Sequence, residues 1–292
     1  MNFRSPIAPP SNFDPRTARR QDLVKHGYPP PPSVRSGPLF DYNNLFSSRN
    51  IYYVPIKPVK LCKPLSIPDW SGAILTEKTY QFDSVCGSFV VPDAYPPVSS
   101  GEYGKEPIYE DGTFECFTWV GLGGYDQKQY LLIGVMSTVT SKNGKITSQD
   151  AYLRGGNEKG DFEFENFKVK PGDLVTGYVC YNYDTCDDDV LYSYVSIVNQ
   201  NAKTKTSHLC KAGDPLDSAE WILEADISRA AQVIDFPDYG ATFFYRTAVE
   251  YKDSNGSTHD TDASRARLVN MTAGQSEGQR FRDVVVVSYY HS

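Results

Sequence analysis

The fold is decided by the stretch Asp217-Ser218-Ala219-Glu220-Trp221-Ile222-Leu223-Glu224. Polar and apolar residues alternate along it, and it contains neither Gly nor Pro, a pattern that predicts a β-strand. Side chains two positions apart share a face of a strand, so Trp221 and Leu223 point one way while Ile222 points the other, between Glu220 and Glu224. The face that carries the two carboxylates is predicted to be the solvent-facing side of an antiparallel strand.

The spacing of the two carboxylates limits their chemistry. A strand rises about 3.3 Å per residue, so Glu220 and Glu224 stand roughly 13 Å apart. That distance is too long for two carboxyl groups to share a proton. Any chemistry at Glu224 therefore needs a partner from another strand.

Composition predicts a mostly β protein. The chain has 292 residues, of which 40% are apolar and 13% aromatic, and it contains 21 Tyr and 15 Phe. Such aromatic richness together with many glycines favours strands over helices. The length suits one large β domain with appendages or two small domains.

Charge and proline divide the chain into two parts. Residues 1–64 hold ten Lys and Arg against three Asp, a net charge of +7, and 12 of the 20 prolines. Because the whole chain carries -7, residues 65–292 carry -14. We therefore expect an extended, basic, proline-rich arm over 1–64, with one short helix near 17–25, attached to an acidic domain over 65–292.

The arm has three possible roles: a free tail, a strap lying on the domain, or a contact to a second copy or a partner protein. Its ten cations are spread without a dense run, so nucleic acid is not the expected partner. No signal peptide and no membrane-spanning stretch is visible, which predicts a soluble, cytoplasmic protein without a membrane partner. The six cysteines include no CxxC pair, which predicts free thiols, no metal site and no cofactor.

Turn residues separate a series of short strand patterns along the domain. Asn143-Gly144 marks a hairpin, and Pro171-Gly172 marks a second turn. Roughly ten to twelve strands with hardly any helix indicate an all-β sandwich. The clearest strands are expected at 69–75, 84–92, 114–121, 130–139, 174–183, 190–199, 217–224, 240–251 and 284–290, and the alternation over 162–169 fits one more.

Five blocks, in this order, resemble the glutamic peptidases (eqolisins): Trp70-Ser-Gly-Ala-Ile-Leu, Gly87-Ser-Phe-Val-Val-Pro92, Trp119-Val-Gly-Leu-Gly-Gly124, Val169-Lys-Pro-Gly-Asp173 and Ala219-Glu-Trp-Ile-Leu-Glu224. The matched blocks run from about residue 70 to 250. The resemblance implies a bent antiparallel two-sheet β-sandwich of concanavalin-like type, with a cleft across the concave sheet.

The resemblance also implies a catalytic pair, of which this chain keeps one member. Glu224 matches the glutamate that acts as acid and base on a water molecule. The glutamine that stabilises the oxyanion is replaced by Leu132 or Ile133, depending on where a one-residue gap falls, and neither side chain can form a hydrogen bond. Gln127 and Gln129 are close in sequence, but several residues of strand would place them roughly 10 Å or more away.

Two other parts of the expected site also differ. Gly123 stands where the family carries Asp, and Ala151 to Gly156 replaces an aromatic block. We therefore expect a peptidase-like sandwich without peptidase activity that serves in binding or assembly. An extended peptide or a glycan would lie in the cleft against Trp70, Trp119 and Glu220, although Trp119 also suits core packing. The alternative is an acid endopeptidase that uses Glu224 as general acid and base.

Overall fold

The computed structural model describes residues 65–289, with gaps at 78, 101–106, 163, 165–166, 184–191, 212, 226–236, 272–275 and 282–283. Of the predicted arm it describes only residues 10, 13–14 and 17–18. Most of the predicted helix near 17–25 therefore lies outside the described residues. Within the described part, no helix has the length and apolar character needed to cross a membrane.

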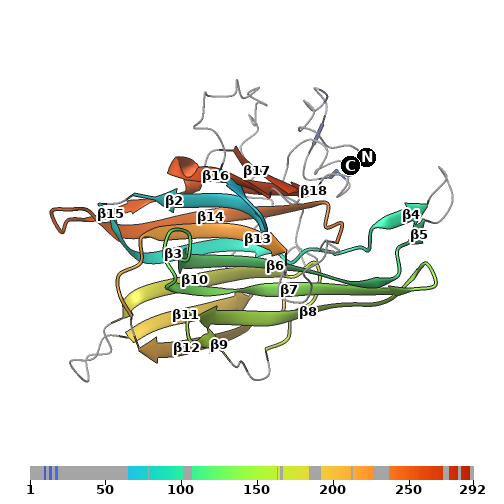
Figure 1. Ribbon diagram of the computed structural model, residues 1–292, viewed down its shortest axis with the longest axis horizontal. Helices are drawn as coiled ribbons and strands as arrows, with labels where there is room; N and C mark the ends of the chain where they lie inside the picture. The colour runs from blue at the N-terminus through green and yellow to red at the C-terminus, as the bar shows by residue number, and fades with distance from the viewer. Residues whose placement is uncertain are drawn as a thin grey trace.

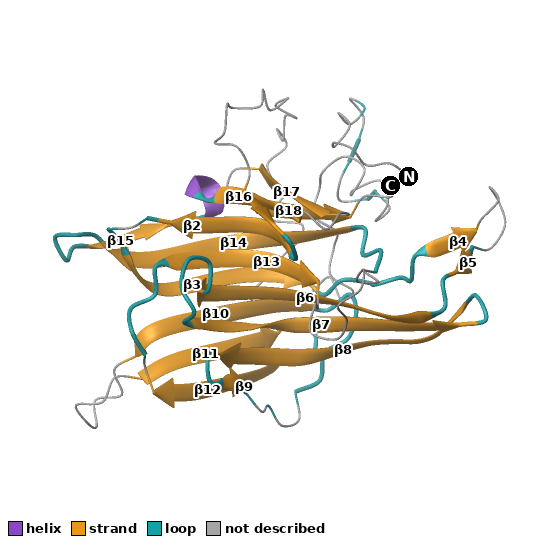
Figure 2. Cartoon of the chain, in the orientation of Figure 1, coloured by secondary structure: helices purple, strands orange, loops and turns teal. Residues whose placement is uncertain are grey.

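The described part is almost entirely β-strand (Figure 1, Figure 2). A single turn of 3-10 helix, η1 (Ala263–Arg265), precedes β16. The strands are β1 (Leu65–Ile67), β2 (Trp70–Thr76), β3 (Gln81–Val90), β4 (Val98–Ser100), β5 (Ile108–Tyr109), β6 (Gly112–Gly123), β7 (Tyr130–Lys142), β8 (Lys145–Asn157), β9 (Gly160–Asp161), β10 (Leu174–Tyr183), β11 (Tyr192–Asn199), β12 (Thr204–Lys211), β13 (Ser218–Ala225), β14 (Ala241–Lys252), β15 (Thr258–Thr261), β16 (Arg267–Met271), β17 (Ser276–Phe281) and β18 (Val284–Tyr289).

The main sheet folds back on itself to make a two-layer sandwich. Its hydrogen-bonded order is β12-β11-β10-β3-β14-β18-β17-β16-β2-β13-β6-β7-β8-β9. The β12-to-β14 half packs on the β2-to-β8 half, and β18 and β17 join the two along one side (Figure 1). Buried valines and isoleucines from both halves fill the space between the layers, among them Val85, Val179, Val120 and Ile133. The predicted all-β, bent antiparallel two-sheet β-sandwich is confirmed.

Trp221 of β13 ties the two layers together. Its side chain is fully buried, and its indole Nε1–H donates a 2.9 Å hydrogen bond to the carbonyl oxygen of Cys86 on the opposite layer. The ring lies against Gly87, where an added Cβ would stand 2.8 Å from Trp221 Cδ1. Glycine at this position therefore lets the opposite layer approach the indole closely.

One predicted strand is wrong, and several strands were not expected. The segment 162–169 forms no strand among its described residues, although Phe162 and Val169 both pack against the sandwich core. Phe162 also stacks on His208, with ring centroids 4.3 Å apart. Its alternation thus reflects a segment packed on the core without a hydrogen-bonded ladder. The unexpected strands are β12, β16 and β17 and the short strands β1, β4, β5, β9 and β15, and β8 is implied only by its hairpin turn.

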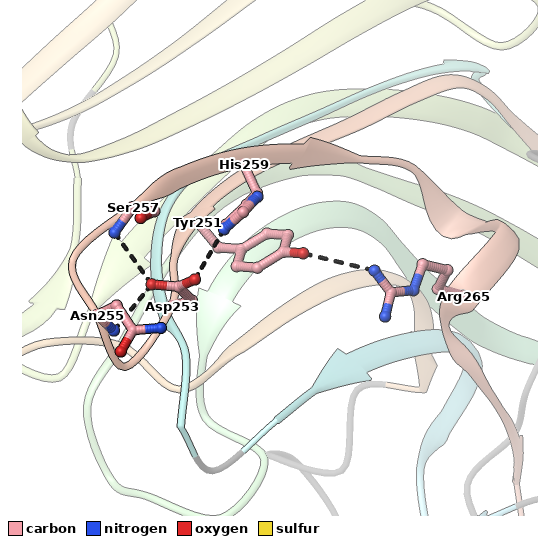
Figure 3. Close-up of polar contacts among 6 residues, drawn as sticks. All are labelled: Tyr251, Asp253, Asn255, Ser257, His259 and Arg265. Atoms are coloured by element: carbon pink, nitrogen blue, oxygen red, sulfur yellow. Dashed lines mark hydrogen bonds and ion pairs between the residues drawn. The ribbon is translucent and has the colours of Figure 1, made fainter.

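A polar cluster closes the β14–β15 hairpin (Figure 3). The Asp253 carboxylate accepts hydrogen bonds from the backbone N–H groups of Asn255 and Ser257, and lies 2.9 Å from His259 Nε2. The His259 contact is the largest of the interactions that lower the pKa of Asp253. Arg265 donates to the Tyr251 hydroxyl at 3.4 Å nearby. These contacts hold the turn and lie in the layer opposite the predicted cleft.

The predicted solvent exposure of Glu220 is wrong. Its side chain is fully buried between Ile74 of β2 and Gly121 of β6, its direct neighbours in the sheet. Neither carboxyl oxygen has a hydrogen-bond partner among the described residues. Burial raises the pKa of Glu220 well above its usual value, and the nearby polar side chain of Ser218 offsets this shift only in part. The neutral carboxylic acid is the form that this position accommodates.

Replacing Trp221 with Phe should destabilise the fold strongly. The change leaves the Cys86 carbonyl buried without its donor and removes part of a packed ring. We expect the free energy of unfolding to fall by about 2–4 kcal/mol, measured by urea denaturation. Trp70→Phe, at a half-buried position, should cost about 1 kcal/mol or less and serves as the matched control. Equal losses in the two variants would contradict the role given to Trp221.

Replacing Glu220 with Gln should change how stability depends on pH. Below the unfolded-state pKa, about 4.3, the carboxyl is neutral in both states and the variant should match the wild type. As pH rises above that value, the unfolded chain ionises while the buried carboxyl does not, so the free energy of unfolding of the wild type falls. We expect the advantage of Glu220→Gln to grow from pH 4 toward neutrality in urea unfolding. A difference that stays constant with pH would contradict a buried neutral acid.

Candidate ligand cleft

The cleft lies on the face of the β2–β13–β6–β7–β8 layer that points away from the sandwich core. Strand register brings residues from distant parts of the chain into rows across this face. One row, in order across the five strands, is Trp70, Glu224, Phe117, Met136 and Tyr152. The next rows are Ile222, Trp119, Gly134 and Arg154, then Glu220, Gly121, Leu132 and Gly156.

A cavity of about 400 Å³ opens over these rows. Glu224 lies in its lining together with two tryptophans and a pair of cations. The complete lining is Trp70, Phe117, Trp119, Gly123, Gly124, Gln127, Lys128, Tyr130, Leu132, Arg154, Asp161 and Glu224. The sheet therefore places the residue matched to the catalytic glutamate inside a cleft that also has aromatic walls.

Trp119 forms the floor of the cleft and holds the Glu224 carboxylate. Its indole Nε1–H donates to Glu224 Oε2 at 2.8 Å, and its ring meets that of Trp70 edge-on, with centroids 5.1 Å apart. Two glycines make room for it: an added Cβ would stand 2.8 Å from the Trp119 ring at Gly121, and 2.5 Å from Trp119 Cβ at Gly134. The side chain of Trp119 therefore packs directly on the main chain at these two glycines.

Leu132 lies on the cleft face at the place where the resemblance expects the glutamine. It is half-buried and lines the cavity, whereas Ile133 is fully buried in the sandwich core. The alternation of β7 explains the difference, because adjacent residues of a strand point to opposite faces. Of the two candidate replacements, Leu132 is the one whose side chain faces the cleft, and that side chain is hydrocarbon.

Gln127 is part of the cavity lining, and its separation of roughly 10 Å or more from the place of the missing glutamine stays a prediction. That distance assumes a strand, whereas residues 125–128 form bends between β6 and β7 that bring the chain to the cleft. The side-chain Nε2 lies over Gly123, 3.1 Å from where a Cβ there would stand, and has no hydrogen-bond partner among the described residues. Gln129 instead donates to Asp214 Oδ2 at 2.8 Å.

Arg154 and Lys128 bring positive charge to the cleft, and the sequence prediction did not single them out. The Arg154 guanidinium lies 5.3 Å from the centroid of the Phe117 ring, and its Nε is 3.4 Å from Asp161 Oδ2. Both contacts orient the guanidinium along the cleft wall. The sequence did hold a signal for Arg154. It lies two positions from Tyr152 in the segment that replaces the aromatic block, so the two side chains share a face of that strand.

The three predicted binding residues have different places. Trp70 and Trp119 line the cavity, while Glu220 is not part of its lining. Their roles in binding stay predictions. Among the described residues, no group of three His, Cys, Asp or Glu side chains is arranged to hold a metal ion. The described cysteines, Cys86, Cys116, Cys180 and Cys210, are free thiols.

The chain was compared with known families and structures. A model of the Peptidase A4 family matches residues 68–289, well over half of the chain. No curated protein matches. The fold is similar to that of scytalido-glutamic peptidase, solved with a transition-state analogue inhibitor, at 18% identity and a TM-score of 0.53 over 76% of this chain and 98% of that one.

A second similar structure is SCP-B, a member of the eqolisin family solved in a complex with the tripeptide Ala-Ile-His. It has 19% identity and a TM-score of 0.51, with the same coverage of 76% and 98%. Both structural matches support the fold, and the family match covers the strands of both layers, those of the cleft included. The resemblance in the sequence blocks is thereby confirmed: the chain belongs to the peptidase A4 family of glutamic peptidases, the eqolisins.

Proposed function

We propose that this protein binds an extended peptide in the cleft without hydrolysing it. The observation that carries the proposal is Leu132, which lines the cleft where the family resemblance expects a glutamine. Hydrolysis of an amide by an activated water develops negative charge on the carbonyl oxygen. A leucine side chain offers that oxygen no hydrogen bond.

The expected loss of rate is large. Removing one oxyanion donor typically costs about 2.7–4 kcal/mol, or 100- to 1,000-fold in rate. The hydrogen bond from Trp119 also occupies one oxygen of the Glu224 carboxylate. Gly123 and Arg154 change two further positions of the expected site. These differences act on turnover and leave the cavity intact.

The cleft has the size and the chemistry to hold a peptide. Its volume of about 400 Å³ falls in the range of small-molecule and short-peptide sites. Trp70 and Phe117 offer apolar walls, while Glu224, Arg154 and Lys128 offer charges for the ends or side chains of a peptide. The similar structures support the same ligand class, because one holds a tripeptide and the other a peptidase inhibitor.

Gln127 favours a second candidate function, an acid endopeptidase that uses Glu224. The Gln127 amide is a buried donor in the cleft lining, and no partner occupies its Nε2 in the described part of the chain. In this alternative, the amide from the β6–β7 connection replaces the one missing from β7. A peptidase assay separates the two candidates.

The wild type should cleave an unfolded protein substrate no faster than Glu224→Gln from strongly acidic to neutral pH. The reason is the missing oxyanion donor at Leu132. Peptide release is measured by mass spectrometry, so that slow cleavage is detected. Cleavage by the wild type that disappears in Glu224→Gln would establish the endopeptidase instead. Loss of that activity in Gln127→Leu, with Gln129→Leu as matched control, would then identify the donor.

Binding should depend on the cleft aromatics. On an array of short, extended peptides, we expect the wild type to retain a subset and Trp70→Ala to bind the same peptides at least tenfold more weakly, about 1.4 kcal/mol. Leu209→Ala, at an exposed residue of β12, should leave binding unchanged. The same test on a glycan array distinguishes the ligand classes. Retention of glycans and not peptides would overturn the proposed ligand.

A further inference from the structure

A second apolar cluster lies on the outer face of the layer opposite the cleft. We call it the outer patch: Val90, Leu174, Phe243, Tyr245 and Val286 from β3, β10, β14 and β18. Their sequence neighbours, among them Phe89, Val175, Phe244 and Val287, belong to the sandwich core. By strand alternation the outer patch therefore points away from that core. Yet each of its residues is at most 3% exposed, so something covers them.

Described residues of the N-terminal arm contribute to the cover of the patch, together with Ala241 and Val284. Phe13 and Ala18 pack against it. They are brought to one side by a local turn, in which the N–H groups of Thr17 and Ala18 donate to the Asp14 carbonyl at 3.2 and 3.1 Å. A further bond runs from the Phe13 N–H to the Pro10 carbonyl at 2.9 Å. The turn thus presents an aromatic ring and a small residue as one apolar surface.

We propose that the outer patch is a docking site for the turn 10–18 and that it accepts the turn of a second copy as well as its own. The turn is held by its own backbone hydrogen bonds, so it carries its binding surface with it wherever the arm reaches. Exchange of an identical segment between two copies preserves every contact of the docked state. It is therefore a low-cost route to pairing.

The chain between the turn and the domain is long enough for either arrangement. Residues 19–64 separate Ala18 from β1, and a fully extended chain of that length spans at most about 150 Å at 3.3 Å per residue. Covalent geometry therefore does not decide which body receives the turn. Docking within one chain competes with pairing, so pairing should increase with protein concentration.

Charge favours docking in both arrangements. Residues 1–64 carry a net charge of +7 and residues 65–292 carry -14. The arm of one copy is therefore attracted to the body of another as well as to its own. The apolar contact of Phe13 supplies the position, while the charge difference raises the rate of encounter.

A labelled synthetic peptide of residues 8–20 tests the docking site on the full-length protein. In Phe13→Asp the protein's own turn is disabled and the patch is free, so we expect the peptide to bind this variant at least tenfold more tightly than the wild type by fluorescence anisotropy. A peptide that itself carries Asp in place of Phe13 should not bind. Equal binding to the two proteins, or none to the variant, would overturn the docking site.

Two further variants keep the test decisive. Val284→Asp, made in the Phe13→Asp protein, places a charge at the half-buried rim of the patch and should abolish peptide binding. Leu209→Asp, at an exposed apolar residue of β12, should leave it intact. Ala18→Asp replaces Phe13→Asp if thermal melting shows that the first variant is unfolded.

Light scattering over a range of concentrations tests the exchange. We expect the mass of the wild type to rise toward that of a dimer as concentration increases, and Phe13→Asp to remain monomeric. A wild type that stays monomeric at every concentration would overturn pairing through the arm, whatever the peptide shows. Dimers that persist in Phe13→Asp would place the interface elsewhere and would also overturn it. Neither outcome depends on the cleft.

Discussion

The packing of Trp221 on Gly87 is the constraint on which the rest of the structure depends. The indole is buried between the layers and bonded to the Cys86 carbonyl, so β13 cannot slide or rotate without breaking a contact to the opposite layer. Because side chains alternate along a strand, fixing Trp221 on the inner face also fixes Ile222 and Glu224 on the outer one. The contact that holds the sandwich together therefore aims the cleft carboxylate. The contact between Trp221 and Gly87 therefore contributes both to the stability of the fold and to the geometry of the site.

Around that fixed carboxylate, the cleft combines aromatic, apolar and charged side chains. Three aromatic side chains line the cavity together with Glu224: Trp70, Phe117 and Trp119. The packing of the sheet holds these rings in place independently of any catalytic role. Leu132 lines the cavity where the resemblance expects an amide, and Gln127 of the β6–β7 connection lines the same cavity. Arg154 adds a cation that is held between Phe117 and Asp161. These features support the proposal that the cleft binds a peptide without hydrolysing it.

The sequence predicted the architecture better than the details of the site, for physical reasons. Local properties of the sequence, namely a period of two and the family blocks, are enough to place the side chains of Trp221, Glu224 and Trp119. The burial of Glu220 could not be predicted, because it depends on β2 and β6, which flank it in space. The place of Gln127 in the cavity lining depends on the bends at residues 125–128, which alternation along a single strand does not predict. The segment 162–169 shows that an alternating pattern can mark apolar side chains packed on the core without the hydrogen-bonded ladder that makes a strand.

The slot that receives Trp119 has a consequence for how this protein can diverge. Its walls at Gly121 and Gly134 are main-chain atoms, which no substitution elsewhere can alter, and its occupant is the residue that positions Glu224. The rim of the cleft, by contrast, consists of side chains on β7, β8 and a connecting segment, each of which can be exchanged singly. Mutations can therefore accumulate at the rim while the frame beneath stays the same. If substitutions are confined to the rim, each intermediate protein along a line of descent can still fold. The activity of the cleft can then change while the fold is kept.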